Sequence, residues 1–296
     1  MRSGAQRGRV ALITDSSACL PPDVTDRLGV RVLPIAIHLP SGDFDDGTPR
    51  APELVYAALA AGEPVKSSAP PTVEYLTAIE GVDAPAIVVI TPAIEFTVMY
   101  RNAVLAAEMA ERKVSVVDSR AAAAAHGLVV LAAAEAAVSG ASESEVVRAA
   151  EDASRRAELV GVLDSLEFIR RSGRVPSVAL ELAERLGVRP VFRLDGGRVE
   201  RLGVPRSSEA ALRRLRREAT MRGLSPSSPS VVFHAASPTR AHELRAALGG
   251  QGTVVEFSPS MGIHTGPGVV GVAWLRDPAG PSEPWAPPPA APRPLP

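Results

Sequence analysis

Short apolar runs alternate with helical segments through the first half of the chain, and this alternation constrains the fold more than any other feature. The run 86–91 (AIVVIT) is apolar up to its last residue, as expected for a strand buried on both faces. Helices between such strands predict a mainly parallel, doubly wound, Rossmann-like sheet. The expected strands are 9–13, 30–37, 86–91 and 114–117, and the expected helices are 21–28, 52–61, one ending near 112, and 121–138.

The second half of the chain has a different order of expected strands and helices. A helix over 143–158 leads into it, and Asp195-Gly196-Gly197 between two apolar runs predicts a hairpin turn. We expect an α+β domain with a mixed or antiparallel sheet. Its expected strands are 159–163, 189–194, 198–203, 231–235, 253–257 and 269–275. The predicted limits are a flexible N-terminus (1–8), an N-terminal α/β domain (9–157), a C-terminal α+β domain (158–276) and a disordered Pro-rich tail (277–296).

Composition excludes several classes of protein. The net charge of −1 is unlike that of nucleic-acid-binding proteins, which carry a clear basic excess. The single Cys19 rules out a disulfide framework and a cysteine-based zinc cluster, and one unpaired thiol fits a reducing cytoplasm. No apolar run is long enough for a membrane span or a secretory signal, and the alanines before His126 are typical of a buried helix. We therefore expect a cytoplasmic protein that binds no nucleic acid.

Hydroxyl and carboxylate side chains follow several of the expected strands or precede expected helices. They are Asp15 and Ser16, Ser67 and Ser68, Thr91 and Thr97, and Asp118 and Ser119. Each of them has an ordinary explanation as a helix cap. Taken together they gather hydroxyls and helix N-termini at the edge of the sheet where ligands bind, and this favours an anion such as a carboxylate.

The segment 263–271 (IHTGPGVVG) is the most unusual stretch of the chain. Its glycines match the spacing of a dinucleotide-binding motif, but that motif must follow a strand and open a helix, whereas this segment precedes an apolar, β-branched run. We instead expect a tight loop in which glycine permits close approach of the backbone, with His264 projecting from it.

Signatures of common enzymes and metal sites are missing from the sequence. There is no G-x-S-x-G nucleophile elbow, and neither Lys66 nor Lys113 lies in a phosphate-binding loop. The five histidines show no metal-ligand spacing. We therefore expect neither a metal nor a cofactor.

In this combination the residues resemble the DegV family of bacterial fatty-acid-binding proteins, from about Val10 to Leu275. The matching motifs are Ile13 to Ser17, Ser67 to Pro70, Thr97 to Ala103, Val117 to Ser119, Leu166 to Val175 with Ser172-Gly173-Arg174, Arg206, and His264 to Gly268. The chain departs from the family pattern at Ala69, where the family often has glutamine, and at Arg171-Ser172, which replaces the more common Lys-Gly.

The resemblance implies two α/β domains with a long-chain fatty acid buried between them. Ser67 and Thr97 would bind the carboxyl group, supported by His264 and Thr265. Thr91 competes with Thr97 as the match for a family serine, because the segment between Thr91 and Tyr100 is longer than usual. Further candidates for the carboxyl site are Ser68, Thr91, Asp15, Ser16 and Gly266.

The resemblance also implies a partner. Family members carry a fatty acid for a separate, dihydroxyacetone-kinase-like fatty-acid kinase, which phosphorylates the carboxylate to an acyl phosphate. Arg174 and Arg206 would face this kinase or its phosphate. Lipid exchange would need only transient contact with a membrane surface.

A carrier that is not itself an enzyme is therefore the expected function. Burial gains about 0.8 kcal/mol per CH₂ group, so a chain of about 16 carbons gains on the order of 10 kcal/mol before ordering costs. Two alternatives stay open. One is a lipid-responsive regulatory or interaction module, and the other is an acyl hydrolase with Ser67 or Thr97 as nucleophile and His264 as base.

Overall fold

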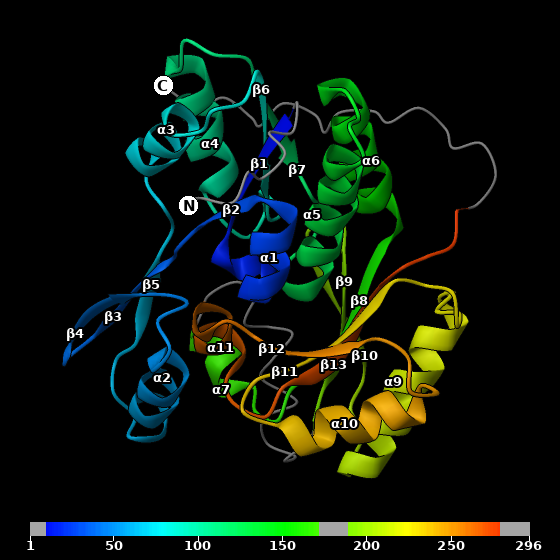
Figure 1. The fold of residues 1–296 in the computed structure, drawn as a ribbon. Helices are drawn as coiled ribbons and strands as arrows, with labels where there is room; N and C mark the ends of the chain where they lie inside the picture. Colours follow the sequence, from blue (N-terminus) through cyan, green and yellow to red (C-terminus); the bar gives the residue numbers. More distant parts are fainter. Residues whose placement is uncertain (1–9, 172–188, 279–296) are drawn as a thin grey trace, which may run out of the picture.

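The computed structural model describes residues 10–171 and 189–278. The predicted N-terminal segment 1–8, the Ser172-Gly173-Arg174 motif and the tail beyond 278 lie outside the described residues. Three sheets form the described part (Figure 1). None of its helices is long and apolar enough to cross a membrane.

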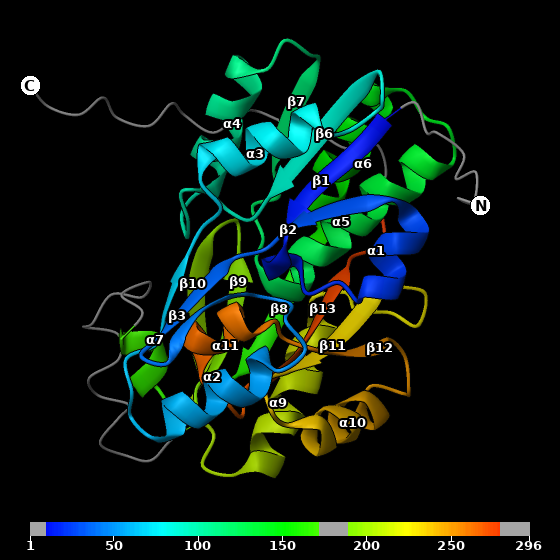
Figure 2. The same ribbon diagram turned by 60° about the vertical axis from the view of Figure 1, so that its left-hand side comes forward.

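The first sheet is parallel throughout, as predicted. Its strands lie in the order β2-β1-β6-β7. Their bounds are β1 (Val10–Asp15), β2 (Val30–Leu33), β6 (Ala86–Thr91) and β7 (Val114–Asp118), and the helices around them are α1 (Pro22–Leu28), α3 (Thr72–Glu80), α4 (Met99–Met109), α5 (Ala123–Val138) and α6 (Glu143–Arg156). Figure 2 shows α3 and α4 on one face of the sheet and α5 and α6 on the other. Alternate residues of β6 face the two layers, which is why the strand is apolar up to its last residue. Val89 packs with the α3–α4 cluster and Ile90 with the α5 cluster.

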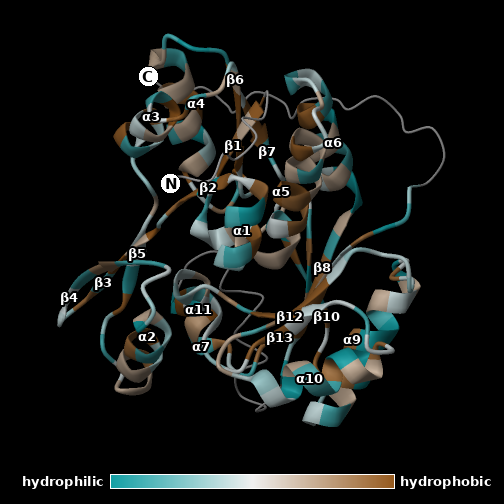
Figure 3. Ribbon diagram, viewed as in Figure 1, coloured by the Kyte–Doolittle hydropathy of each residue, from teal (hydrophilic) through white to brown (hydrophobic). Residues whose placement is uncertain are grey.

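The second sheet is mixed, also as predicted, with the order β10-β9-β8-β13-β11-β12. Only β11 and β12 run parallel; the other neighbours are antiparallel. The bounds are β8 (Ala157–Val162), β9 (Val191–Asp195), β10 (Arg198–Gly203), β11 (Ser230–His234), β12 (Thr253–Glu256) and β13 (Val270–Leu275). Helices α9 (Ser208–Met221) and α10 (Pro238–Ala247) cover its outer face, and their exposed sides are hydrophilic (Figure 3).

A third, small sheet was not predicted. It has the order β4-β3-β5, with β3 (Ala36–Leu39), β4 (Gly42–Asp45) and β5 (Lys66–Ser68), and α2 (Ala51–Ala60) packs on it. The expected strand 30–37 is therefore wrong as one element. Pro34, which has no N–H to donate to a ladder, follows β2, and the chain then enters a different sheet at β3.

Helix α5 connects the two large sheets. It is buried almost all round, from Ala123 to Ala137, and one apolar cluster joins it to β1, β6, β8 and β13. At Gly127 a Cβ atom would lie 2.3 Å from the carbonyl oxygen of Ala18, so only glycine allows this close packing. The two halves thus share one apolar core, and the domain boundary between residues 157 and 158 stays a prediction.

Candidate functional site

A cavity of about 460 Å³ lies between the two large sheets and the small one. Its volume is within the range of about 300–1,000 Å³ that is usual for ligand sites. Its wall is mostly apolar, formed by residues such as Leu163, Leu166, Ile169 and Phe192. Six hydroxyl or imidazole side chains also line it: Ser17, Ser67, Thr97, Ser260, His264 and Thr265. The cavity therefore combines a large apolar surface with a small polar one.

The strand β5 aims Ser67 into this cavity. Ser67 pairs in register with the fully buried Ile37 of β3, and its Oγ lies 3.4 Å from Nε2 of His264. Successive side chains of a strand point to opposite faces. Ser68 is accordingly exposed, and its Oγ lies 2.8 Å from Nε2 of His38. Of the two adjacent serines named from the sequence, only Ser67 lines the cavity.

The expected loop around His264 is a helix. His264 lies in the last turn of α11 (Pro259–Thr265), which begins with Pro259 at a position where a missing N–H costs nothing. The predicted loop over 263–271 is therefore wrong for residues 263–265, which are helical, whereas residues 266–269 form a tight turn as expected. The close approach expected of the glycines is present: a Cβ on Gly266 would lie 2.1 Å from the ring of Phe168, and one on Gly268 would lie 2.4 Å from Asp164.

We expect Gly266→Ala to destabilise the fold by about 1–2 kcal/mol more than Gly249→Ala. Both glycines have positive φ angles, +76° and +85°, which strain any other residue, and Gly266 also has a ψ of 167°, a combination that is essentially restricted to glycine. Only Gly266 has a neighbour in the way, since nothing lies within 4 Å of a Cβ on Gly249. Urea denaturation of the two variants measures the difference, and equal midpoints would show that Phe168 moves aside at no cost.

A buried carboxylate fastens the small sheet to α11. Asp46 is 4% exposed and accepts hydrogen bonds from Ser16 Oγ at 2.7 Å, Ser260 Oγ at 2.5 Å and the Ser260 backbone N–H at 3.3 Å. Ser16 Oγ in turn accepts from the backbone N–H of Ile35 at 3.1 Å. Four segments thus meet at one carboxylate beside the polar wall of the cavity. Ser16, named from the sequence as a ligand contact, is engaged in this network.

The two competing threonines have different surroundings. Thr97 lines the cavity, half-buried, and its Oγ1 accepts from the Met99 backbone N–H at 3.4 Å. Thr91 is fully buried at the end of β6, and its Oγ1 has no hydrogen-bond partner among the described residues. This geometry favours Thr97 as the cavity hydroxyl.

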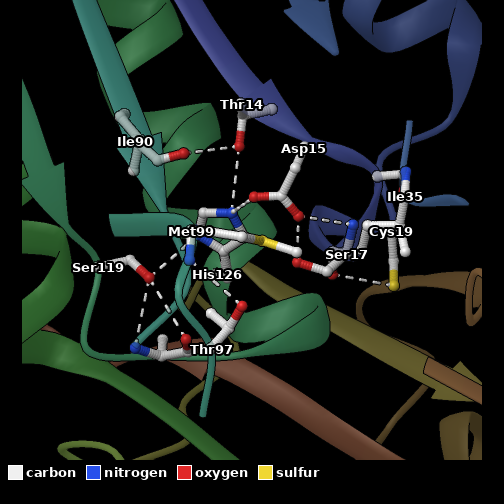
Figure 4. Close-up of polar contacts among 12 residues, drawn as sticks. Thr14, Asp15, Ser17, Cys19, Ile35, Ile90, Thr97, Met99, Ser119 and His126 are labelled. Atoms are coloured by element: carbon white, nitrogen blue, oxygen red, sulfur yellow. Dashed lines mark hydrogen bonds and ion pairs between the residues drawn. The ribbon is translucent and has the colours of Figure 1, made fainter. Parts of the chain in front are cut away.

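Asp15 does not line the cavity and lies in a buried polar group with Thr14, Ser119 and His126 (Figure 4). Thr14 Oγ1 donates to the carbonyl oxygen of Ile90, so it accepts from Nε2 of His126 at 3.1 Å. Nδ1 of His126 then accepts from Ser119 Oγ at 3.0 Å, which fixes the neutral tautomer. Burial lowers the pKa of His126 to about 3.

The Asp15 carboxyl is only partly satisfied. Its Oδ1 accepts from Oγ and the backbone N–H of Ser17, whereas Oδ2 has no hydrogen-bond partner among the described residues and lies 3.9 Å from His126 Nε2. Burial raises the pKa of Asp15 to about 6, against the opposite effect of the Ser17 hydrogen bonds. Asp15 is thus placed to support Ser17, which lines the cavity, rather than to contact a ligand.

Arg206 is exposed on the surface after β10, and Arg174 lies outside the described residues. Sequence reasoning missed three residues that shape the site. Ser260 and Arg201 line the cavity, and Asp46 holds Ser260. No local motif marks them, because their partners are distant in sequence.

Comparison with known proteins gives a consistent result. A family model described as "Uncharacterised protein, DegV family" matches residues 9–277. A DegV domain-containing protein of Streptomyces coelicolor is 33% identical over 272 residues, covering 89% of this chain and 97% of that protein. One of Mycobacterium tuberculosis is 31% identical over 275 residues, covering 89% of this chain and 96% of that protein.

Among solved structures, a DegV family protein from Thermus thermophilus described as binding fatty acid superposes with a TM-score of 0.82 at 25% identity, covering 90% of this chain and 99% of that one. The chain therefore belongs to the DegV family.

Proposed function

We propose that this protein holds one long-chain fatty acid in the cavity and presents its carboxylate to a partner kinase in the cytoplasm. The observation that carries the proposal is the lining of the cavity, which is mostly apolar and includes hydroxyls and an imidazole. Such a wall suits an alkyl chain with one anionic head group, because apolar burial supplies the affinity and a few polar groups fix the orientation. The fatty-acid binding described for the Thermus thermophilus protein supports the same ligand class.

The head group would lie against Ser67, Thr97 and His264. Hydroxyls donate to a carboxylate, and Ser67 and His264 come from two different elements, β5 and α11. Thr265, in the same last turn of α11, also lines the cavity. The kinase would transfer a phosphoryl group from ATP to the carboxylate oxygen and release ADP, and the exposed Arg206 would face it.

The first experiment is native mass spectrometry of the purified protein, followed by organic extraction and identification of the lipid. We expect one fatty acid per chain. A protein that arrives empty, and that takes up no added fatty acid between 12 and 20 carbons long, would contradict the proposal.

Substitution of the cavity hydroxyls tests the head-group assignment. We expect Ser67→Ala combined with Thr97→Ala to weaken palmitate binding about 30-fold, because each of the two lost hydrogen bonds to the carboxylate is worth roughly 1 kcal/mol. Ser68→Ala is a matched control, because this neighbouring serine is exposed and bonded to His38 on the other face of β5. Equal palmitate affinities for the double variant and the control, measured by titration calorimetry, would remove these hydroxyls from the site.

A further inference from the structure

One cation lines the cavity, and neither the family motifs nor the head-group assignment uses it. Arg201 is the only charged side chain among the described residues of the wall. It lies on β10, the edge strand of the mixed sheet, opposite Phe192 of β9, whose ring also lines the cavity. Arg201 is exposed as well, so its side chain lies where the cavity meets solvent.

The alternation of side chains along β10 sorts its charges onto two faces. Val199 and Arg201 line the cavity. Arg198, which precedes Val199, and Glu200, which lies between the two, therefore point to the opposite face. Glu200 lies 3.3 Å from Arg193 on that face. The neighbouring carboxylate is thus turned away from Arg201.

The charge of Arg201 is not neutralised within residues 10–171 and 189–278. In the described wall of the cavity there is no carboxylate, and the side chain of Arg201 forms no ion pair or hydrogen bond with a described residue. By contrast, Arg193 on the neighbouring strand β9 forms ion pairs with Glu158, Asp195 and Glu200. A guanidinium keeps its charge at any physiological pH, and it attracts anions strongly where an apolar wall reduces screening.

We propose that Arg201 is a guide at the mouth of the cavity that attracts the carboxylate of an incoming fatty acid and favours anionic over neutral lipids of the same chain length. The inference rests on the proposed function and deepens it, since it assigns a specificity residue to the same cavity. The carboxylate meets Arg201 first and the hydroxyls afterwards. The main effect is therefore on the rate of association, which is what a charge at the rim of a site usually controls.

The test compares Arg201→Gln with Arg198→Gln in stopped-flow fluorescence, using delipidated protein with parinaric acid and its methyl ester as probes. Both variants lose one positive charge from β10, but only the first loses it from the cavity side. We expect Arg201→Gln to slow association of the acid by roughly 5-fold at low ionic strength, and the difference to vanish near about 1 M salt. Arg198→Gln should match the wild type, and the ester should bind all three proteins at one rate.

Two results would overturn the inference. One is an unchanged rate for the acid in Arg201→Gln, and the other is equal slowing of acid and ester, which would mean that the side chain acts through its shape. A wild-type protein that binds neither probe would instead contradict the proposed function, so the two failures are distinguishable.

Discussion

Asp46→Ala should lower the free energy of unfolding by about 4 kcal/mol, the largest loss that we expect from a single substitution near the cavity. The carboxylate is 4% exposed and accepts from the hydroxyls of Ser16 and Ser260 and from a backbone N–H. Its removal leaves these donors buried without an acceptor and opens a void between the small sheet and α11. Guanidinium denaturation measures the change.

Asp45→Ala is the matched control, because Asp45 is the exposed neighbour in β4. It should leave the denaturation midpoint nearly unchanged. Asp46→Asn keeps the shape and one acceptor oxygen, so it should fall between the two. A midpoint for Asp46→Ala equal to that of the control would show that the network adds nothing to stability.

Asp15→Asn should stabilise the protein above pH 6, by about 1–3 kcal/mol. Burial raises the pKa of Asp15 from 3.8 to about 6, so the folded state favours the protonated carboxyl. The contribution of Asp15 to stability is therefore full below pH 3.8 and is lost as the pH rises through about 6. Asparagine is neutral throughout, and its side-chain oxygen can still accept from Ser17.

The expected signature is a gain in melting temperature that is larger at pH 7.5 than at pH 4. His126 does not disturb the comparison, because its lowered pKa keeps it neutral in both folded proteins above about pH 4. Asp26→Asn on the exposed side of α1 controls for the loss of a negative charge. A gain independent of pH, or no gain at all, would refute the buried-charge explanation.

The sequence predicted those elements whose pattern is set by burial. The apolar run of β6 has the predicted bounds, because a strand covered on both faces needs an apolar residue at almost every position. By contrast, β4 (GDFD) and β5 (KSS) carry no such pattern. They are strands because β3 pairs with both of them, and strand preference depends strongly on such context.

The residues of the site likewise fall into those that the sequence could predict and those that it could not. Ser67, Thr97, His264 and Thr265 were named from motifs, and all four line the cavity. Asp46 could not be found from sequence, because its partner Ser260 is 214 residues away and nothing local links the two. Thr91 and Thr97 likewise differ only in the folded protein, where helices cover β6 on both faces and bury Thr91, whereas Thr97 lines the cavity.

Adjacent side chains of β5 face opposite sides of the small sheet, so the pairing register of this strand decides which serine faces the cavity. With Ser67 turned inward and Ser68 outward, deletion of one residue within the paired segment 66–68 would either shift the pairing with β3 or exchange which serine faces the cavity. The irregular connection before Lys66 carries no such constraint, because a loop can absorb a change in its length. Related chains that keep the inward hydroxyl should therefore vary in length before β5 and not within it.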